Sequence, residues 1–245
     1  MDGAIADPFQ RGSGWGALER LRREAAGEEP FCMNLVFDDA SLTEAQRPWV
    51  ELLQQGVPPV VDPQASPTGY LIQREWAAHL EDAVVGPSIP GSESGSEPAS
   101  RWWALLHLGV MRYAAGDPAQ AQEAWRLSLA CNANPWAARN LAFVAWEDGR
   151  YHVAAELYIR ALEMPPGLLP LAIECGQKLI AMGQAGTWLN LLAGLPADVR
   201  AAGRIRLLEG QAALEIGDLD RVEPLFDGTL VVDDLREGER SLSQL

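Results

Sequence analysis

The chain has 245 residues, of which 48% are hydrophobic and 22% charged, so it is long enough to bury a core and too apolar for wholesale disorder. It carries 19 basic and 34 acidic side chains, a net charge of −15, which argues against a nucleic-acid partner because binding to phosphate backbones requires clustered positive charge. The sequence contains no apolar signal-peptide core, no apolar run of about 18 residues and no cysteine pattern of a disulfide framework or a zinc site. We therefore expect a cytoplasmic protein with no membrane partner, no metal and no cofactor.

Residues 1–85 are predicted to hold three helices, too few for a core of their own, so we expect this segment to pack on the rest of the chain. Trp49 and Trp76 are interpreted as the anchors of that packing. A capping-box signature at Ser41–Glu44 opens the second helix, and Gly56 stops it. The helices are predicted at residues 15–26, from the capping box to residue 55, and at 71–84.

Loops, a linker and a tail separate these elements from the rest of the chain. Residues 31–37 could form a short extended segment, and four prolines within residues 56–69 predict a loop. Residues 86–100 have the Gly, Pro, Ser and Glu composition of a flexible linker. Residues 229–245 form an acidic tail without a clear terminal cap, so the chain could be a piece of a longer protein.

A repeat organises residues 101–228. Four glycines recur at spacings of 33, 34 and 34 residues, and a small residue stands seven positions before each of them. The segments on both sides of each glycine have helical apolar spacing, so each unit is predicted to be a helix, a glycine-centred turn and a second helix. The glycines are Gly116, Gly149, Gly183 and Gly217, and the small residues are Gly109, Ala142, Gly176 and Gly210.

The small residues are expected where the two helices of a unit approach each other most closely. In the first unit Gly109 pairs with Ala121, and Trp125, one turn later, fills the space beside them. The second unit repeats this pattern. In the third and fourth units Trp188 and Val222 stand at the position of the small residue, so we expect their helix pairs to be splayed or shifted.

The repeat resembles the tetratricopeptide repeat family, closely in the stretches LHLGVMRYAAGDPAQAQEAW and NLAFVAWEDGRYHVAAELYIRALEMPP, and in part in AIECGQKLIAMGQ and LLEGQAALEIGDLDRVEPLF. The resemblance implies an all-α fold, an α-solenoid of about four helix-turn-helix units with the N-terminal helical segment packed on it. It also implies a protein-protein interaction module or scaffold. It does not name the partner, because the family binds many unrelated proteins.

A wider resemblance covers roughly residues 12–245. The chain is similar to the C-terminal region of a family of large bacterial proteins of uncharacterised function, in the strings GWGALERLRR, QRPWVELLQQGVPP, RWWALLHLGVMRY, ARNLA and DLREGERSLSQL. In that family the repeats follow a β-sandwich similar to galactose-mutarotase-like folds. An alternative function is therefore an accessory part of a carbohydrate-active, glycoside hydrolase-like protein, although the β-sandwich and its sugar chemistry lie outside this sequence.

In a tetratricopeptide solenoid the first helices of successive units line the concave face, and the resemblance places nine candidate binding residues there. Large aromatic rings beside polar groups supply apolar area and orienting hydrogen bonds for a protein or peptide partner, or for a carbohydrate. Alternatively, the N-terminal helices fill this groove and the same aromatic residues are ordinary core. The candidates are Trp103, Tyr113, Trp136, Arg139, Phe143, Trp146, Glu174, Gln177 and Arg204.

Some members of the family hold a C-terminal carboxylate with a clamp of Lys, Asn and Arg. Asn140 occupies the position of a clamp asparagine, but Leu106, Val110 and Glu174 replace the other members. A clamp for chaperone tails is therefore not expected, and Asn140 is interpreted as a local hydrogen-bonding residue.

The remaining reactive side chains form no pattern typical of catalysis. His107 is interpreted as a satisfied core histidine, and Cys131 and Cys175 as small buried residues of the helix pairs. Two of the carboxylates Glu147, Asp148 and Glu174 could form an acid–base pair in a groove, but a solvated or ion-paired helix surface is the simpler interpretation. We therefore assign no catalytic residue and expect a non-catalytic scaffold.

Overall fold

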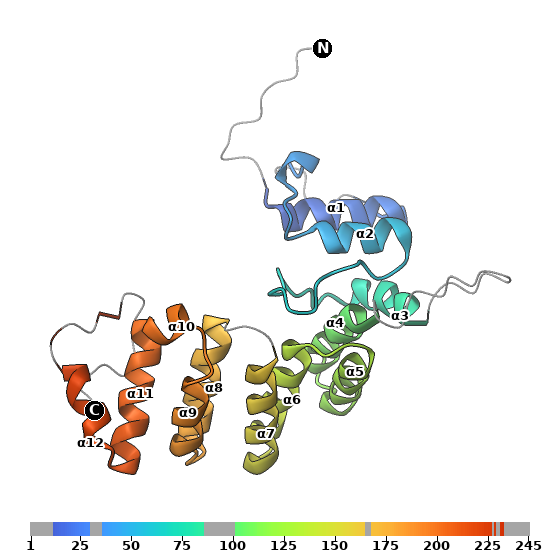
Figure 1. Cartoon of the computed structure of the whole chain (residues 1–245). Helices are drawn as coiled ribbons and strands as arrows, with labels where there is room; N and C mark the ends of the chain where they lie inside the picture. Colours follow the sequence, from blue (N-terminus) through green and yellow to red (C-terminus); the bar gives the residue numbers. More distant parts are fainter. Residues whose placement is uncertain are drawn as a thin grey trace. The chain divides into compact units, whose positions relative to one another are not determined.

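The computed structural model describes residues 12–29, 36–85, 101–164, 168–226, 228 and 231–232. The chain divides into two compact units: unit 1, residues 1–133, and unit 2, residues 134–245. In the described residues the regular structure consists of twelve α-helices and short 3₁₀ turns, with no β-strand (Figure 1). The expected all-α class is therefore confirmed.

Unit 1 begins with short helices that pack in succession, α1 with α2, α2 with α3, and α3 with α4. The side chain of Ser13 caps α1 by accepting a hydrogen bond from the backbone of Gly16 at 3.4 Å. The N-terminal segment therefore packs against the first helix of the repeat, as expected. The bounds are α1 Gly14–Ala26, η2 Asp39–Ser41, α2 Arg47–Gln55, η3 Arg74–Trp76 and α3 Ala77–Val85.

Helix α2 begins at Arg47, later than the signature at Ser41–Glu44 predicts, and its N-cap residue, Gln46, makes no side-chain capping hydrogen bond. Gln46 Oε1 accepts hydrogen bonds from the backbone N–H of Thr43 at 3.0 Å and from its hydroxyl at 2.9 Å. Thr43 and Gln46 thus pair in the turn before the helix, and the expected capping box of Ser41 and Glu44 is not formed. Its predicted stop is confirmed, since Gly56 has a φ of 67° and donates its N–H back into the last turn.

The first pair of the repeat, α4 (Arg101–Ala114) and α5 (Pro118–Cys131), is closely packed. A Cβ atom placed on Gly109 would lie 2.3 Å from the indole nitrogen of Trp125, which leaves no room for a side chain at this position. The indole N–H of Trp125 donates to the carbonyl of Leu106 at 3.1 Å. The small residue therefore marks the contact between the two helices, as predicted.

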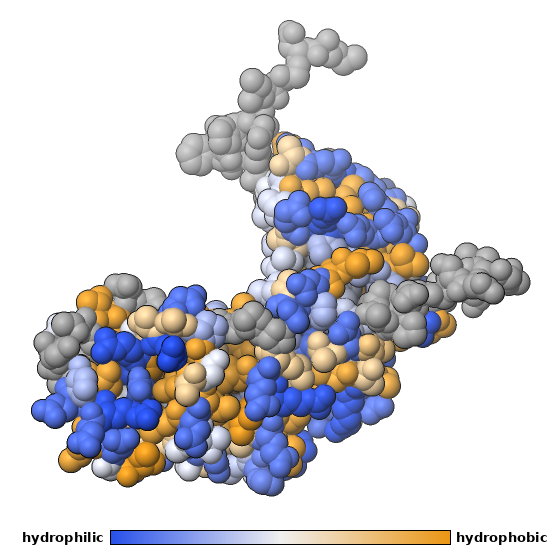
Figure 2. All heavy atoms as spheres, viewed as in Figure 1, coloured by the Kyte–Doolittle hydropathy of each residue, from blue (hydrophilic) through white to orange (hydrophobic). Residues whose placement is uncertain are grey.

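Unit 2 contains the remaining helices. Helix α6 packs on α7, α7 on α8, and both α8 and α9 on α11 (Figure 1). In the view of Figure 2, hydrophobic and hydrophilic surfaces alternate over these helices. The bounds are α6 Pro135–Glu147, α7 Tyr151–Glu163, α8 Leu169–Ala181, α9 Ala185–Leu192, α10 Ala197–Ala201, α11 Gly203–Ile216, α12 Leu219–Val222 and η5 Glu223–Phe226.

The four glycine turns of the repeat share one backbone geometry. Each glycine has a φ between 72° and 84°, the left-handed conformation that ends a helix. In each turn the residue after the glycine donates its N–H to the carbonyl five residues earlier, at 2.8 or 2.9 Å, and the glycine donates to the carbonyl three residues earlier. The period of the sequence is therefore also a period of backbone hydrogen bonds. The glycines are Gly116, Gly149, Gly183 and Gly217.

The last two helix pairs have shorter second helices than the first two. Helix α9 has 8 residues and α12 has 4, whereas α5 has 14 and α7 has 13. A Cβ atom on Gly176 of α8 would lie 2.8 Å from Trp188 of α9 and 3.1 Å from Leu208 of α11. The large ring of Trp188 thus occupies the space that a small residue leaves in the first two pairs.

Some predictions fall on residues that the structure does not describe. They are the linker at 86–100, Cys32, most of the extended segment at 31–37, and the tail at 229–245 apart from residues 231–232. The division between the two units falls after Ala133, inside the predicted repeat region 101–228.

Candidate binding face

Four of the candidate residues form a stripe along α6. Trp136, Arg139, Phe143 and Trp146 follow one another at intervals of three and four residues, which places them on the same side of a helix. All four side chains are half-buried. The stripe is therefore part of the surface and also in contact with neighbouring helices.

Helix α8 adds a carboxylate to this stripe. The Nε–H of Arg139 lies 3.0 and 2.9 Å from the two carboxylate oxygens of Glu174, and the hydroxyl of Tyr158 donates to Oε1 at 3.2 Å. The side chains of Arg139 and Glu174 remain 35% and 25% exposed. Glu174 is thus held by groups from α6 and α7, and its charge is balanced by an arginine.

One turn further along α8, Lys178 reaches the other end of the stripe. Its ammonium nitrogen lies 3.2 Å from the centroid of the Trp146 ring, and the guanidinium carbon of Arg139 lies 5.4 Å from the centroid of Phe143. Both distances are within the range of cation–π attraction. We call the surface formed by Arg139, Phe143, Trp146, Glu174 and Lys178 the α6–α8 face.

Burial shifts the pKa of the ionisable groups at this face. The pKa of Lys178 lies below its ordinary value because burial disfavours the ammonium form, although the nearby Glu174 carboxylate opposes this effect. Burial, with the negative charge of Glu174, raises the pKa of the Tyr158 hydroxyl and of the Cys175 thiol. Both groups are therefore neutral at physiological pH. The Cys175 thiol donates to the carbonyl of Tyr158 at 3.5 Å, in agreement with its interpretation as a small buried residue.

Asn140 lies beneath the face. Its side-chain oxygen accepts a hydrogen bond from Arg139 Nη1 at 3.1 Å, and the residue is 8% exposed. Its side-chain nitrogen is buried without a hydrogen-bond partner. Asn140 was expected to form a local hydrogen bond, and its side-chain oxygen does so with Arg139, which it helps to orient.

Trp103 does not lie on an open surface. It is 4% exposed, and its ring centroid lies 4.8 Å from that of Trp49 in α2 and 4.3 Å from that of His107. The N-terminal segment covers this part of α4, which corrects the placement of Trp103 among the binding residues and agrees with the alternative that these helices fill the groove. Tyr113, almost three turns later in α4, is 37% exposed.

The other two candidates lie beside the α6–α8 face or on another helix. Gln177 is exposed on α8, one turn after Glu174. Arg204 is half-buried near the start of α11. Direct contacts thus join three of the nine candidates, Arg139, Phe143 and Glu174, whereas Trp146 contacts Lys178 on the same face.

Sequence reasoning missed Lys178 and Tyr158 as parts of this group. Lys178 is the only lysine of the chain and follows Glu174 by one helical turn, a spacing that places both side chains on one side of α8. Tyr158 packs inside the second helix pair and is fully buried. Its hydroxyl, which lies at the edge of that packing, reaches Glu174.

His107 occupies the centre of an aromatic cluster in unit 1. Its ring centroid lies 4.7 Å from that of Trp49 and 5.1 Å from that of Tyr70, in addition to its contact with Trp103. The expected core position of His107 is confirmed. The expectation that its ring nitrogens are hydrogen-bonded is wrong, because Nδ1 is buried without a hydrogen-bond partner. Burial lowers the pKa of His107 to about 3.

The described helices include none that is long and apolar enough to span a bilayer. Three or more metal-ligating side chains do not come together anywhere in the part of the chain that the structure describes. No family model, no curated protein and no solved structure matches the chain.

Proposed function

We propose that the chain is a non-catalytic, tetratricopeptide-like helical repeat protein that binds a polypeptide segment on the α6–α8 face. The repeat supports the fold part of this proposal, since four glycine turns with identical hydrogen bonding follow one another at 33 or 34 residues. Arrays of this kind use the side chains of successive helices as a binding surface. A cytoplasmic location belongs to the same proposal, and the unpaired thiols of Cys131 and Cys175 favour it.

The observation that carries the binding role is the pair of aromatic rings held in place by cations. Trp146 and Phe143 are half-buried, and Lys178 and Arg139 restrict their positions. Rings ordered before binding lose less conformational entropy when a partner covers them. Partly exposed aromatic residues beside arginine are also the residue types that contribute most to protein interfaces.

The charges of the face indicate the chemistry of the partner. Glu174 is already balanced by Arg139, whereas Lys178 has no carboxylate within ion-pair distance among the described residues. An acidic side chain of the partner would offset the cost of burying the Lys178 ammonium group. We therefore propose a segment that places an apolar side chain against Trp146 and Phe143 and an acidic side chain next to Lys178.

The same geometry disfavours a carbohydrate at this face. A sugar ring stacks on the open side of a tryptophan, but the Lys178 ammonium group lies 3.2 Å from the centre of the Trp146 ring and covers one of its two sides. A sugar on that side would have to displace the cation and lose its attraction to the ring. A polypeptide with a carboxylate gains from the cation instead.

The proposal is tested by selecting peptides from a random displayed library on the immobilised protein and measuring the selected peptides in solution by calorimetry. Trp146→Ala should weaken their binding by about tenfold or more, as expected for a central aromatic contact. Tyr151→Ala is the matched control, because Tyr151 is an aromatic residue of α7 that is 54% exposed and lies outside the face. Equal weakening in both variants, or no selected peptide, contradicts the proposal.

The role of Lys178 is tested with Lys178→Met, which keeps most of the apolar stem and removes the charge. Wild-type protein should prefer a selected peptide with aspartate over the same peptide with asparagine, and the variant should lose this preference. A preference that persists in the variant assigns recognition of the acidic group to another residue. Equal thermal unfolding of the two proteins serves as the control for folding.

A further inference from the structure

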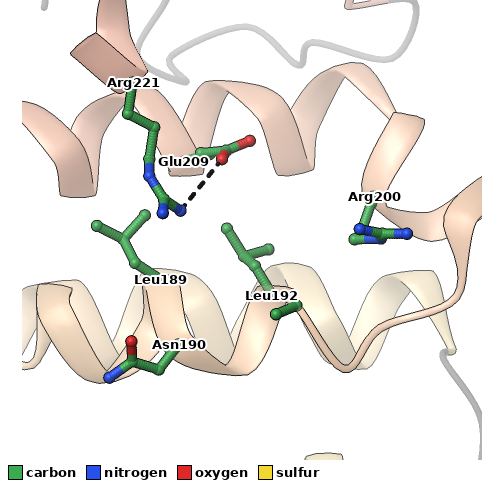
Figure 3. A pocket seen from close by; sticks show the side chains of 7 residues that line it. Leu189, Asn190, Leu192, Arg200, Glu209 and Arg221 are labelled. Carbon is green, nitrogen blue, oxygen red and sulfur yellow. Dashed lines mark hydrogen bonds and ion pairs between the residues drawn. The ribbon is translucent and has the colours of Figure 1, made fainter. Parts of the chain in front are cut away.

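A cavity lies in unit 2, lined by residues other than those of the α6–α8 face. It has a volume of about 360 Å³ and opens between α9, α11 and the short helices α10 and α12 (Figure 3). This volume is within the range of small-molecule sites. Its residues differ from those of the proposed peptide site, so the two sites can be tested independently.

Leucines form the apolar wall of the cavity. Leu189 and Leu192 of α9 are 6% and 4% exposed, and their side chains point toward α11 (Figure 3). Ala193 continues this wall and is exposed. An apolar ligand chain that lies along α9 would therefore cover the exposed Ala193 and the small part of the two leucines that faces the cavity.

Two arginines and one glutamate supply the charges of the lining. Arg221 lies 3.5 Å from Glu209 and 3.4 Å from Asp218, so its charge is largely balanced by carboxylates. Arg200 is exposed and lies at the other end of the cavity, and its guanidinium group has no ion-pair or hydrogen-bond partner within the described part of the chain (Figure 3). The cavity thus combines an apolar wall with an unpaired cation at one end.

We infer that this cavity binds a small amphipathic carboxylate, with its apolar chain on Leu189 and Leu192 and its carboxylate at Arg200. Arginine pairs with carboxylates through charge-assisted hydrogen bonds, and Arg200 has all of its donors available. Glu209 would repel a carboxylate placed near Arg221, which fixes the direction of the ligand in the cavity. The Leu192 side chain, which lies between the two arginines in Figure 3, then contacts the apolar chain.

The inference is tested by calorimetric titration of the full chain with octanoate, with octan-1-ol and acetate as the matched ligands. Octanoate should bind to a single saturable site. Octan-1-ol, which lacks the charge, and acetate, which lacks the apolar chain, should each bind about tenfold more weakly or not detectably. Absence of saturable octanoate binding, or equal binding of octan-1-ol, overturns the inference.

Variants assign the site. Arg200→Gln should weaken octanoate binding about tenfold, whereas Arg160→Gln, the same change at an exposed arginine of α7, should leave it unchanged. Ala193→Asp places a carboxylate in the lining at an exposed position and should also weaken binding, whereas the uncharged Ala193→Asn should do so less. If Arg200→Gln has no effect, or Arg160→Gln has an equal effect, octanoate binds elsewhere and the inference is wrong.

Discussion

The ammonium group of Lys178 in α8 lies 3.2 Å from the centre of the Trp146 ring in α6. This contact joins two helices that are separated in sequence by the whole of α7. With the hydrogen bonds between Arg139 and Glu174, it fixes the position of the aromatic stripe. The face proposed for binding is therefore organised by cross-helix pairs and does not depend on α6 alone.

Lys178 should titrate below its ordinary value of 10.5 in the folded protein, because burial disfavours its charged form. The unfolded chain then binds more protons in the interval between the two pKa values, so the free energy of unfolding rises with pH across that interval. The chemical shift of ¹³C-labelled lysine reports this group directly, since the chain has a single lysine. A folded-state midpoint at or above that of the urea-unfolded chain contradicts the assignment.

Removal of the carboxylate charge at Glu174 should weaken the side-chain link between α6 and α8. Glu174→Gln is expected to lower the free energy of unfolding by about 1 kcal/mol, because the pair with Arg139 is partly exposed and hydrogen-bonded. Urea unfolding measures this change. Glu156→Gln on α7, where the carboxylate is 65% exposed, is the control and should change stability by less than about 0.5 kcal/mol. Equal losses in the two variants would mean that Glu174 has no special role in packing.

Glycine-to-alanine changes should have opposite effects at two helical positions. Gly109→Ala should cost about 1–3 kcal/mol, because the new methyl group collides with the Trp125 ring. Gly186→Ala should gain about 0.5 kcal/mol, because nothing lies within 4 Å of its Cβ position in α9 and alanine is the better helix former. Urea unfolding of both variants gives the comparison. Unchanged stability for Gly109→Ala would show that α4 and α5 do not meet at this residue.

The free energy of unfolding should fall as the pH drops below 6.5. The folded-state pKa of His107 is lowered to about 3 from an ordinary value of 6.5, so the unfolded chain binds the additional proton between these pH values. One such group contributes a slope of at most about 1.4 kcal/mol per pH unit.

His107→Phe should remove this part of the slope, since a phenyl ring fills the aromatic cluster without titrating. His152→Gln is the control, because His152 is 89% exposed on α7. Urea unfolding between pH 4 and 7 separates the two variants. A slope that is unchanged in His107→Phe would assign the acid sensitivity to other groups.

The helix pairs and their turns could be predicted because their causes are local. The left-handed conformation that ends a helix favours glycine at one position. The recurrence of such glycines every 33 or 34 residues is visible in the sequence. The contact between Gly109 and Trp125 depends on side-chain volume, which is also visible there. The departure at Trp188 follows from the same argument, because the volume of the ring that fills the space beside Gly176 is also visible in the sequence.

The binding face was predictable only in part. The spacing of Arg139, Phe143 and Trp146 identifies one side of α6, but the partners of these residues come from α8, and their distance depends on how α7 separates the two helices. The burial of Trp103 depends on the docking of Trp49 from a distant segment. The capping signature at Ser41–Glu44 is not used, because Thr43 pairs with Gln46 in the turn before α2.

The single lysine has a practical consequence for measuring interactions of this chain. Amine coupling, a common way to fix proteins on sensor surfaces, reacts with lysine side chains and with the α-amino group. Here the only side chain available to it is Lys178, next to Trp146. A sensor prepared in this way would attach part of the molecules through the face under study and hide it from a partner, so capture through an affinity tag is the appropriate arrangement.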